Sequence, residues 1–193
     1  MEQARRYFNR EISWLQFNER VLQEAEDPTV PLIERIRLLG IHSNNTDEFF
    51  RVRYSSIRRL TLSENQGFNE DLEGYEPSKL LKKLIEMVTY QQGKSQEIYT
   101  ELEQELRTHD VEVVDERQLT AKQMRYIRKF FREKISPALT KLMLSQAPEF
   151  PYLRDKSIFL AVRILQGKNE QFSIIEVPTG AAGRFVTLPR YGK

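Results

Sequence analysis

Apolar residues recur every three or four positions through the first hundred residues, the spacing of one face of an α-helix. The first run predicts a helix from Trp14 to Glu26, ended by Asp27-Pro28. Ser13 and Gln16 have the spacing of a capping box at its start. We interpret Trp14 as a core anchor, since buried aromatic rings usually carry packing. The buried face is expected to contain Leu15, Leu22 and Ala25.

A second apolar stripe follows Pro31, a residue typical of a first helical turn, and comprises Leu32, Ile33, Ile36 and Leu39. The polar run Ser43-Asn44-Asn45 then interrupts it with side chains that compete for backbone hydrogen bonds. The helical spacing resumes through Phe49, Val52, Ile57 and Leu60. Asn45 and Glu48 have the spacing of another capping box. We therefore predict that the helix kinks or restarts at Asn45.

A third helical pattern is separated from the second by residues 63–76, which contain five acidic residues, two glycines and no basic residue. That composition predicts an exposed loop. Pro77-Ser78 then starts a long helix whose apolar seam becomes polar at Gln91 or Gln92. Its apolar positions are Leu81, Leu84, Val88, Ile98 and Leu102. A narrow stripe of this kind suits packing against two shorter helices, so residues 1–108 are predicted to form a three-helix bundle-like domain.

The pattern changes after His109. Residues 111–114 are a short strand candidate, and Thr120 has the position of an N-cap for a further helix. Pro137 is expected to end or kink that helix. Its buried residues are predicted to be Met124, Ile127, Phe131 and Ile135. Its exposed residues are predicted to be Arg125, Arg128, Lys129 and Arg132.

Two β-rich runs, 158–165 and 172–177, are joined by Gln166-Gly167-Lys168-Asn169, which predicts a hairpin. Residues 184–188 are a candidate for a third strand. The predicted fold class is thus α followed by α+β, with a helical domain at 1–108 and an α+β domain at 109–193. Three strands and one helix make a small core, so we expect the second domain to be truncated within this chain.

Composition narrows the class of protein. Charged residues make up 30% of the 193 residues and hydrophobic residues 39%, which is typical of a soluble globular protein. The net charge of +2 is too close to zero to indicate nucleic-acid binding. There is no cysteine, no signal-peptide pattern and no apolar run of the ~20 residues needed to cross a bilayer. We expect a cytoplasmic protein with no transmembrane segment.

The chemistry-bearing residues leave several interpretations open. The sequence has no P-loop and no nucleophile elbow, and its two histidines, His42 and His109, lack carboxylates at metal-ligand spacing. His42 is the better placed of the two, but a single imidazole is more often structural. Two arginine rows, one from Arg51 to Arg59 and one at Arg125, Arg128 and Arg132, are either solvated faces or phosphate sites. Asn45 is either a helix cap or a ligand contact.

Two runs are more distinctive than any of these: Ser-Trp-Leu-x-Phe-Asn-x-Arg-Val-Leu at 13–22 and Ser-Asn-Asn-x-Asp-Glu-Phe at 43–49. Together with Pro-Leu-Ile-Glu-Arg at 31–35, they resemble the N-terminal domain of the bacterial polyphosphate kinases that work through a phosphohistidine. Glu-Arg-Gln-Leu-Thr at 116–120 is similar to the start of the next domain of that family, the head or middle domain. The resemblance extends from about Tyr7 to Thr120.

The resemblance implies an enzyme that reversibly moves the terminal phosphate of ATP onto a polyphosphate chain, with ATP, ADP and inorganic polyphosphate as ligands. The phosphohistidine, the Mg²⁺ ligands and the phosphate-binding arginines of the family belong to C-terminal domains outside these 193 residues. Neither His42 nor His109 lies in the family's catalytic motif. We therefore expect no catalytic residue and no metal ligand in this chain, and we expect the isolated chain to be inactive.

One site residue carries over from the family: Asn45 matches the Asn that contacts ATP, on the adenine side. The resemblance also implies a homo-oligomer, either a dimer or a tetramer, in the full enzyme, with the head domain contributing to dimerisation. No nucleic-acid partner is expected, and a peripheral association with the membrane is compatible with the family.

The alternative is a non-enzymatic binding or assembly module that uses its arginine rows to contact nucleic acid or acidic proteins. Strong salt-dependent binding to DNA or RNA would favour it, whereas the near-neutral net charge argues against it.

Overall fold

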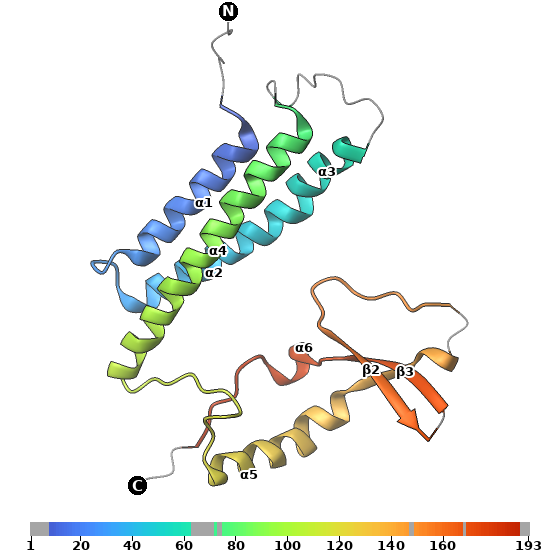
Figure 1. Ribbon diagram of the computed structural model, residues 1–193. Coiled ribbons are helices and arrows are strands. Elements are labelled where there is room, and N and C mark those ends of the chain that lie inside the picture. The colour runs from blue at the N-terminus through green and yellow to red at the C-terminus, as the bar shows by residue number, and fades with distance from the viewer. Residues whose placement is uncertain (1–7, 63–71, 73–74, 147–148, 168, 190–193) are drawn as a thin grey trace, which may run out of the picture. The chain divides into compact units, whose positions relative to one another are not determined.

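The computed structural model describes the chain except residues 1–7, 63–71, 73–74, 147–148, 168 and 190–193. The chain divides into two compact units, Met1–Val113 and Val114–Lys193 (Figure 1). The first unit is helical and the second combines helices with a small sheet, as the sequence predicted.

Three helical rods form the first unit (Figure 1). The first is α1, Arg10–Glu26. The second consists of α2, Leu32–Glu48, the π-helical segment η1, Phe49–Tyr54, and α3, Ser55–Leu62. The third is α4, Pro77–Thr108, which starts at the predicted proline. These rods confirm the predicted three-helix arrangement, while most of the loop predicted at 63–76 lies outside the described residues.

The start of α1 corrects two predictions. Oδ1 of Asn9 caps the helix by accepting from the amides of Glu11 (3.2 Å) and Ile12 (3.1 Å). The capping box predicted at Ser13 is wrong, because Ser13 already lies within the helix and its amide donates to the Asn9 carbonyl. Trp14 is 36% exposed and is not a core anchor, because it lies beside the buried face. The face itself is as predicted, with Leu15, Leu22 and Ala25 buried.

The cap predicted at Asn45 is also wrong. The helix does not restart there, since α2 continues to Glu48 and passes directly into η1. The Thr46 hydroxyl donates to the His42 carbonyl of its own helix, and the Asn45 side chain donates to Asn18 of α1. Asn45 therefore makes a tertiary contact instead of a cap, and the departure from α geometry comes only at the π-helical turns that follow.

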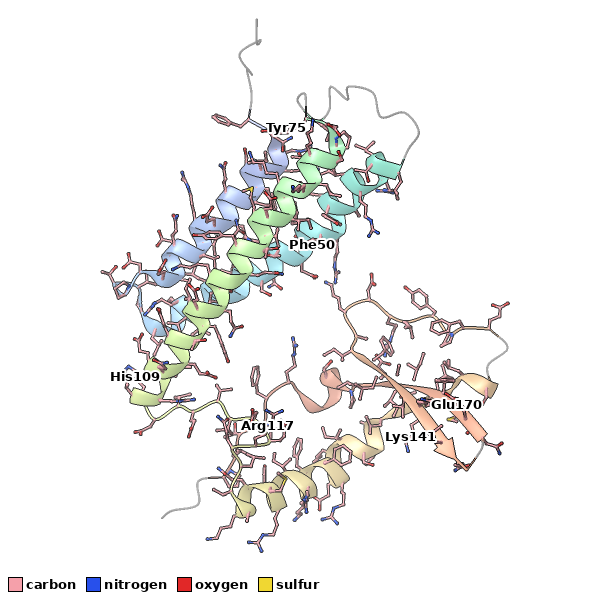
Figure 2. All side chains as sticks on the ribbon, in the orientation of Figure 1. Phe50, Tyr75, His109, Arg117, Lys141 and Glu170 are labelled. Atoms are coloured by element: carbon pink, nitrogen blue, oxygen red, sulfur yellow. The ribbon has the colours of Figure 1, made fainter. Side chains whose placement is uncertain are left out.

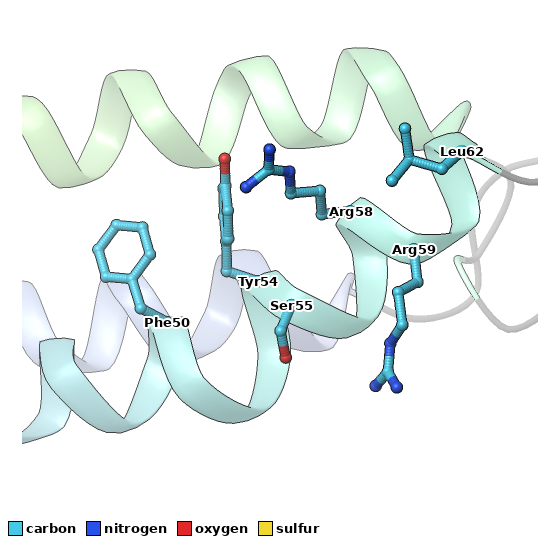
Figure 3. A pocket seen from close by; sticks show the side chains of 6 residues that line it. All are labelled: Phe50, Tyr54, Ser55, Arg58, Arg59 and Leu62. Atoms are coloured by element: carbon cyan, nitrogen blue, oxygen red, sulfur yellow. The ribbon is translucent and has the colours of Figure 1, made fainter. Parts of the chain in front are cut away.

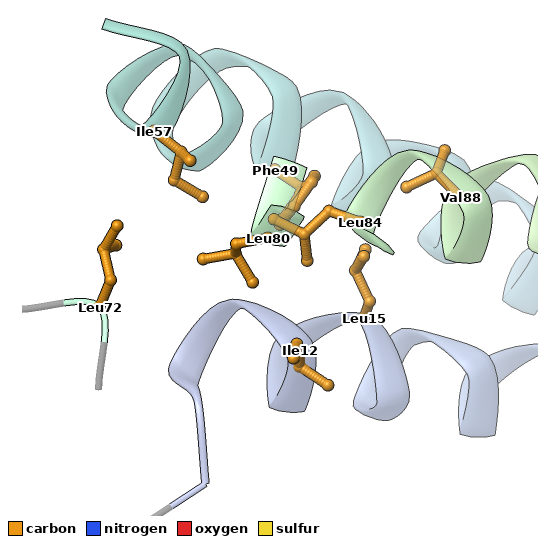
Figure 4. Close-up of a cluster of buried hydrophobic side chains, with 8 residues drawn as sticks. All are labelled: Ile12, Leu15, Phe49, Ile57, Leu72, Leu80, Leu84 and Val88. Atoms are coloured by element: carbon orange, nitrogen blue, oxygen red, sulfur yellow. The ribbon is translucent and has the colours of Figure 1, made fainter. Parts of the chain in front are cut away.

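Two apolar clusters form the core of the first unit. Burying each large apolar side chain stabilises the fold by about 1.5–3 kcal/mol. Val52 and Ile33, which the pattern placed inside, are 52% and 55% exposed. The first cluster contains Ile12, Leu15, Phe49, Ile57, Leu72, Leu80, Leu84 and Val88 (Figure 4). The second cluster contains Leu22, Ala25, Leu39, Ile98 and Leu102.

A buried arginine joins the three rods beyond the second cluster. The Arg35 side chain donates from Nε to the Ala25 carbonyl (2.9 Å) and from Nη2 to the Glu26 carbonyl (3.3 Å). Its Nη1 forms an ion pair with Glu105 of α4 at 2.9 Å. Because the last carbonyls of a helix lack partners within it, Arg35 of α2 closes the end of α1 and ties both helices to α4.

The second unit contains α5, a three-stranded antiparallel sheet and short helical turns. Thr120 forms the predicted capping box with Gln123. The sheet order is β1-β3-β2, so β3 is central, and the β2–β3 hairpin confirms the prediction. The elements are α5 (Ala121–Phe130), η3 (Phe131–Ile135), η4 (Ser136–Ala138), β1 (Thr140–Met143), η5 (Leu144–Gln146), β2 (Phe159–Gln166), β3 (Asn169–Glu176) and α6 (Thr179–Ala182).

Three predictions for this region are wrong. Residues 184–188 form no strand, because β1 occupies the free edge of β3. Residues 111–114 form no strand either, since the Val111 amide returns to the Leu106 carbonyl (3.0 Å) across Asp110 in the left-handed region, which ends α4. Phe131 is 48% exposed rather than buried, because it begins the π-helical segment η3, where the α-helical face no longer continues.

Candidate functional site

A layer of polar side chains separates the two apolar clusters of the first unit. Asn18 comes from α1, His42 and Thr46 from α2, and Gln91 from α4. All four are buried, with Asn18 fully inaccessible to solvent. Burying a polar group costs free energy unless it is hydrogen-bonded, so the bonds within this layer decide its effect.

The bonding pattern fixes the orientation of two amides. Nδ2 of Asn18 donates to the His42 carbonyl (3.2 Å) and to the Thr46 hydroxyl (3.1 Å). A carbonyl only accepts, so the amino group of Asn18 must face the His42 carbonyl, and its Oδ1 is then free to accept from Asn45. Nδ2 of Asn45 donates to that oxygen at 3.0 Å. Asn45 therefore keeps its own Oδ1 as an acceptor, and no described residue donates to it.

His42 and Gln91 complete the layer. Nε2 of Gln91 donates to the Leu15 carbonyl at 2.8 Å, which ties α4 to α1. Burial lowers the pKa of His42, and the neighbouring Gln91 side chain opposes this shift only in part. Nε2 of His42 and Oε1 of Gln91 have no partner within hydrogen-bonding distance among the described residues. The lowered pKa favours the uncharged form of the buried imidazole.

The first arginine row, in η1 and α3, is partly neutralised by carboxylates. Arg51 pairs with Asp47 at 3.1 Å, and Arg53 lies 3.9 Å from the buried Glu11. Arg58 and Arg59 line an open hollow of about 550 Å³ with Phe50, Tyr54, Ser55 and Leu62. In Figure 3 Arg58 extends beside Tyr54 and Arg59 points away from it. Arg51 and Arg53 do not line this hollow, so the first row is not brought together at one site.

The second arginine row lies on one surface, as predicted. Arg125, Arg128 and Arg132 line a hollow of about 780 Å³ together with Ile127, Lys129 and Phe131. All three guanidinium groups are exposed, and Nε of Arg132 donates to the Arg128 carbonyl at 3.3 Å. None of the three pairs with a carboxylate among the residues that the structure describes.

His109, a metal site and a membrane-spanning helix remain to be considered. His109 is exposed at the end of α4 (Figure 2). In the described part of the chain no three His, Asp or Glu side chains gather as a metal site requires. The same residues include no helix long and apolar enough to cross a membrane.

Comparison with known proteins identifies the family. The polyphosphate kinase N-terminal domain matches residues 7–114 and the polyphosphate kinase middle domain matches residues 122–193. The chain belongs to the polyphosphate kinase family. Among its relatives, the polyphosphate kinase of Vibrio vulnificus strain YJ016 is 40% identical over 185 residues, which are 95% of this chain and 26% of that protein. That of Escherichia coli K12 is 37% identical over 191 residues, covering 98% and 27%.

Solved structures agree with this assignment. The crystal structure of the polyphosphate kinase from Porphyromonas gingivalis superposes with a TM-score of 0.68 at 30% identity, over 94% of this chain and 27% of that one. The predicted fold class and family are thereby confirmed. The chain spans about a quarter of the length of the relatives it matches.

Sequence reasoning missed the partners of Asn45 in this family's first domain. In α1 the positions 15, 18, 22 and 25 are spaced alternately by three and four, and in α2 the positions 39, 42, 46 and 49 have the same spacing. Asn18 of α1 and His42 and Thr46 of α2 therefore occupy core positions of their helices. Gln91 occupies the polar interruption that was noted in the α4 seam. Polar residues at core positions of three consecutive helices are the signal that predicts a buried polar layer.

Proposed function

We propose that this chain is part of an enzyme that reversibly transfers the terminal phosphate of ATP to inorganic polyphosphate, and that its first unit helps to bind the ATP. Membership of the polyphosphate kinase family supports the reaction. The orientation of the Asn45 amide is the observation that supports the nucleotide role.

Asn45 presents an acceptor for one particular kind of ligand group. One N–H of its Nδ2 donates to Asn18, and its Oδ1, to which no described residue donates, is available for an incoming donor. The exocyclic amino group of adenine is a donor, whereas guanine has a carbonyl oxygen at the equivalent ring position. Ile41 lies one turn earlier on the same helix and is 47% exposed, which provides an apolar surface for the flat base. We propose that this pair contacts adenine and disfavours guanine.

The phosphoryl-transfer groups are proposed to lie outside this chain. His42 is buried among the helices and His109 is an isolated surface residue, so neither is assigned as the phosphorylated histidine. The described carboxylates form no cluster suited to Mg²⁺, and no metal ligand is assigned here. Mg²⁺ would neutralise the charge of the transferred phosphate in the complete enzyme. A homo-oligomeric complete enzyme, dimeric or tetrameric, is part of the same proposal.

The nucleotide role is tested by titrating the isotope-labelled chain with ATP and with GTP and following amide shifts by NMR. ATP should perturb the amides around Asn45 more strongly than GTP does. Asn45→Ala should abolish this difference, whereas Asn44→Ala, which changes an exposed neighbour, should preserve it. Equal responses to both nucleotides, or an ATP response that survives Asn45→Ala, would exclude the role of Asn45.

The catalytic part of the proposal has its own test. The purified chain should transfer no phosphate from ATP to polyphosphate, because the transfer groups are proposed to lie elsewhere. Addition of the remaining domains of the enzyme should restore transfer. Turnover by the chain alone would contradict this division of roles.

A further inference from the structure

The two units carry opposite net charges, although the whole chain is nearly neutral. Residues 1–113 contain fifteen Lys or Arg against twenty-one Asp or Glu, a net charge of −6. Residues 114–193 contain fifteen Lys or Arg against seven Asp or Glu, a net charge of +8. The total of +2 therefore conceals a basic second unit, and a basic surface attracts polyanions.

Four of the fifteen basic residues of this unit line one hollow on α5 and the turn that follows it. Arg125, Arg128 and Arg132 occupy positions i, i+3 and i+7, and they line one hollow. At a rise of 1.5 Å per residue the row extends for about 10 Å along the helix axis. A row of that length can contact several successive anionic groups of a linear ligand at once.

The carboxylates of the second unit do not neutralise this row. Arg154 pairs with Glu176 at 2.7 Å, and Arg163 pairs with Glu170, both at the sheet. Glu133 of η3 lies 3.9 Å from Lys129 of α5. The three arginines of the row have no such partner among the described residues, so their charges are available to a ligand.

We propose that the surface formed by Arg125, Arg128 and Arg132 binds the chain of inorganic polyphosphate. This inference rests on the proposed function, which makes polyphosphate the polyanion that the enzyme handles. Each internal phosphate of that chain carries a negative charge, and guanidinium groups bind phosphate oxygens in pairs. A polymer that contacts three arginines together is held much more tightly than single phosphates are.

Nucleic acid suits this surface less well. Single-stranded nucleic acid is usually held by base stacking on exposed aromatic rings as well as by charge. On α5 the rings of Tyr126 and Phe130 stack on each other, with centroids 6.5 Å apart. Phe131 is the ring that lines the hollow. Four of the six side chains that line the hollow are cationic and one is aromatic, so contacts to phosphate can outnumber stacking contacts.

Binding is tested with the full 193-residue chain, long-chain polyphosphate and a salt series, followed by isothermal titration calorimetry. The triple variant R125Q/R128Q/R132Q should weaken binding about 10- to 100-fold near 0.1 M salt. The slope of log K against log salt should fall by about 2, since each lost contact releases about 0.7 of a counterion on a single strand. The control R37Q/R58Q/R59Q removes the same charge from exposed arginines of the first unit and should change both quantities little.

Two further measurements test whether charge alone or loss of helical structure explains a change in binding. R125K/R128K/R132K keeps the charge and should retain most of the salt slope, while circular dichroism should show that every variant keeps its helix content. Failure of the unmodified chain to bind polyphosphate, or equal losses in the triple variant and its control, would overturn the inference. An oligonucleotide of equal charge that binds as tightly, and loses affinity in the same variant, would replace polyphosphate by nucleic acid.

Polyphosphate binding by the arginine row can be disproved while the nucleotide role of Asn45 stands, and the nucleotide role can be disproved while polyphosphate binding stands. The ATP-dependent amide shifts around Asn45 should be unchanged in R125Q/R128Q/R132Q. If those shifts persist while polyphosphate binding is absent, only the polyphosphate surface is disproved. If polyphosphate binding depends on the row while ATP produces no shifts, the nucleotide role of Asn45 is disproved instead.

Discussion

The polar layer of the first unit and the arginine row of the second both place polar groups on helices, but in opposite surroundings. Asn18 is fully buried, and its amide is satisfied by protein groups. Arg125, Arg128 and Arg132 are exposed and have no described carboxylate partner. A buried, satisfied group is coupled to the fold, whereas an exposed, unpaired charge is available to a ligand. Substitutions should therefore lower stability in the first case and binding in the second.

The largest loss of stability is expected for Arg35→Ala. This change leaves the Ala25 and Glu26 carbonyls at the end of α1 without their donor and removes the ion pair to Glu105. Because the guanidinium is buried, we expect a loss of about 3 kcal/mol in the free energy of unfolding. Urea denaturation measures it. Arg37→Ala changes an exposed arginine two positions away and should cost less than about 0.5 kcal/mol. Similar small losses in both variants would show that burial does not distinguish these arginines.

Asn18→Leu should cost about 2 kcal/mol, because the Asn45 amino group loses its acceptor, and the Thr46 hydroxyl and the His42 carbonyl lose a donor. The matched control is Asn44→Leu, the same exchange at an exposed position, which should alter stability by less than about 0.5 kcal/mol. Thermal and urea unfolding of both variants provide the comparison. If the two variants are equally stable, the polar layer does not contribute to the stability of the first unit.

The sequence predicted the features of the fold that depend on residues close together in the chain. Helical spacing predicted most of the buried apolar residues of α1 and α4, although Leu80 is buried where Leu81 was expected, and the turn residues were sufficient for the β2–β3 hairpin. The cap at Thr120 was predicted correctly because its capping box involves only Thr120 and Gln123, three positions apart.

The errors arise where a residue outside the expected motif engages the same group. The Ser13 and Asn45 boxes have valid spacing, but Asn9 caps α1 first and Asn18 engages Asn45 from another helix. Strand β1, Thr140–Met143, is short and was not predicted, because its pairing with β3 depends on tertiary contacts. The Asn45 position was predicted from the family pattern, but the orientation of its amide follows only from the Asn18 contact.

A smaller effect is expected from pH, again in the buried layer. Burial lowers the pKa of His42 below its ordinary value near 6.5, so the unfolded chain takes up this proton at higher pH than the folded chain does. Stability that is present above pH 6.5 should therefore decline as pH falls towards the folded-state pKa, by at most about 1.4 kcal/mol per pH unit. His42→Gln should remove this component, which is obtained as the difference between the two stability profiles. An imidazole proton titration by NMR with its midpoint at or above 6.5 would contradict the assignment.

The smallest effect on stability is expected for Arg128→Gln, at the centre of the arginine row. Its side chain is exposed and forms no described ion pair, and glutamine has a similar helix propensity, so the free energy of unfolding should change by less than about 0.5 kcal/mol. Polyphosphate affinity should nevertheless fall, by a factor of about 2 to 5, since one exposed charge contact contributes up to about 1 kcal/mol. Unfolding and calorimetric titration of the same preparation separate the two quantities. A substantial loss of stability without loss of affinity would mean that the row resembles the buried layer, because its charges would then serve the fold rather than a ligand.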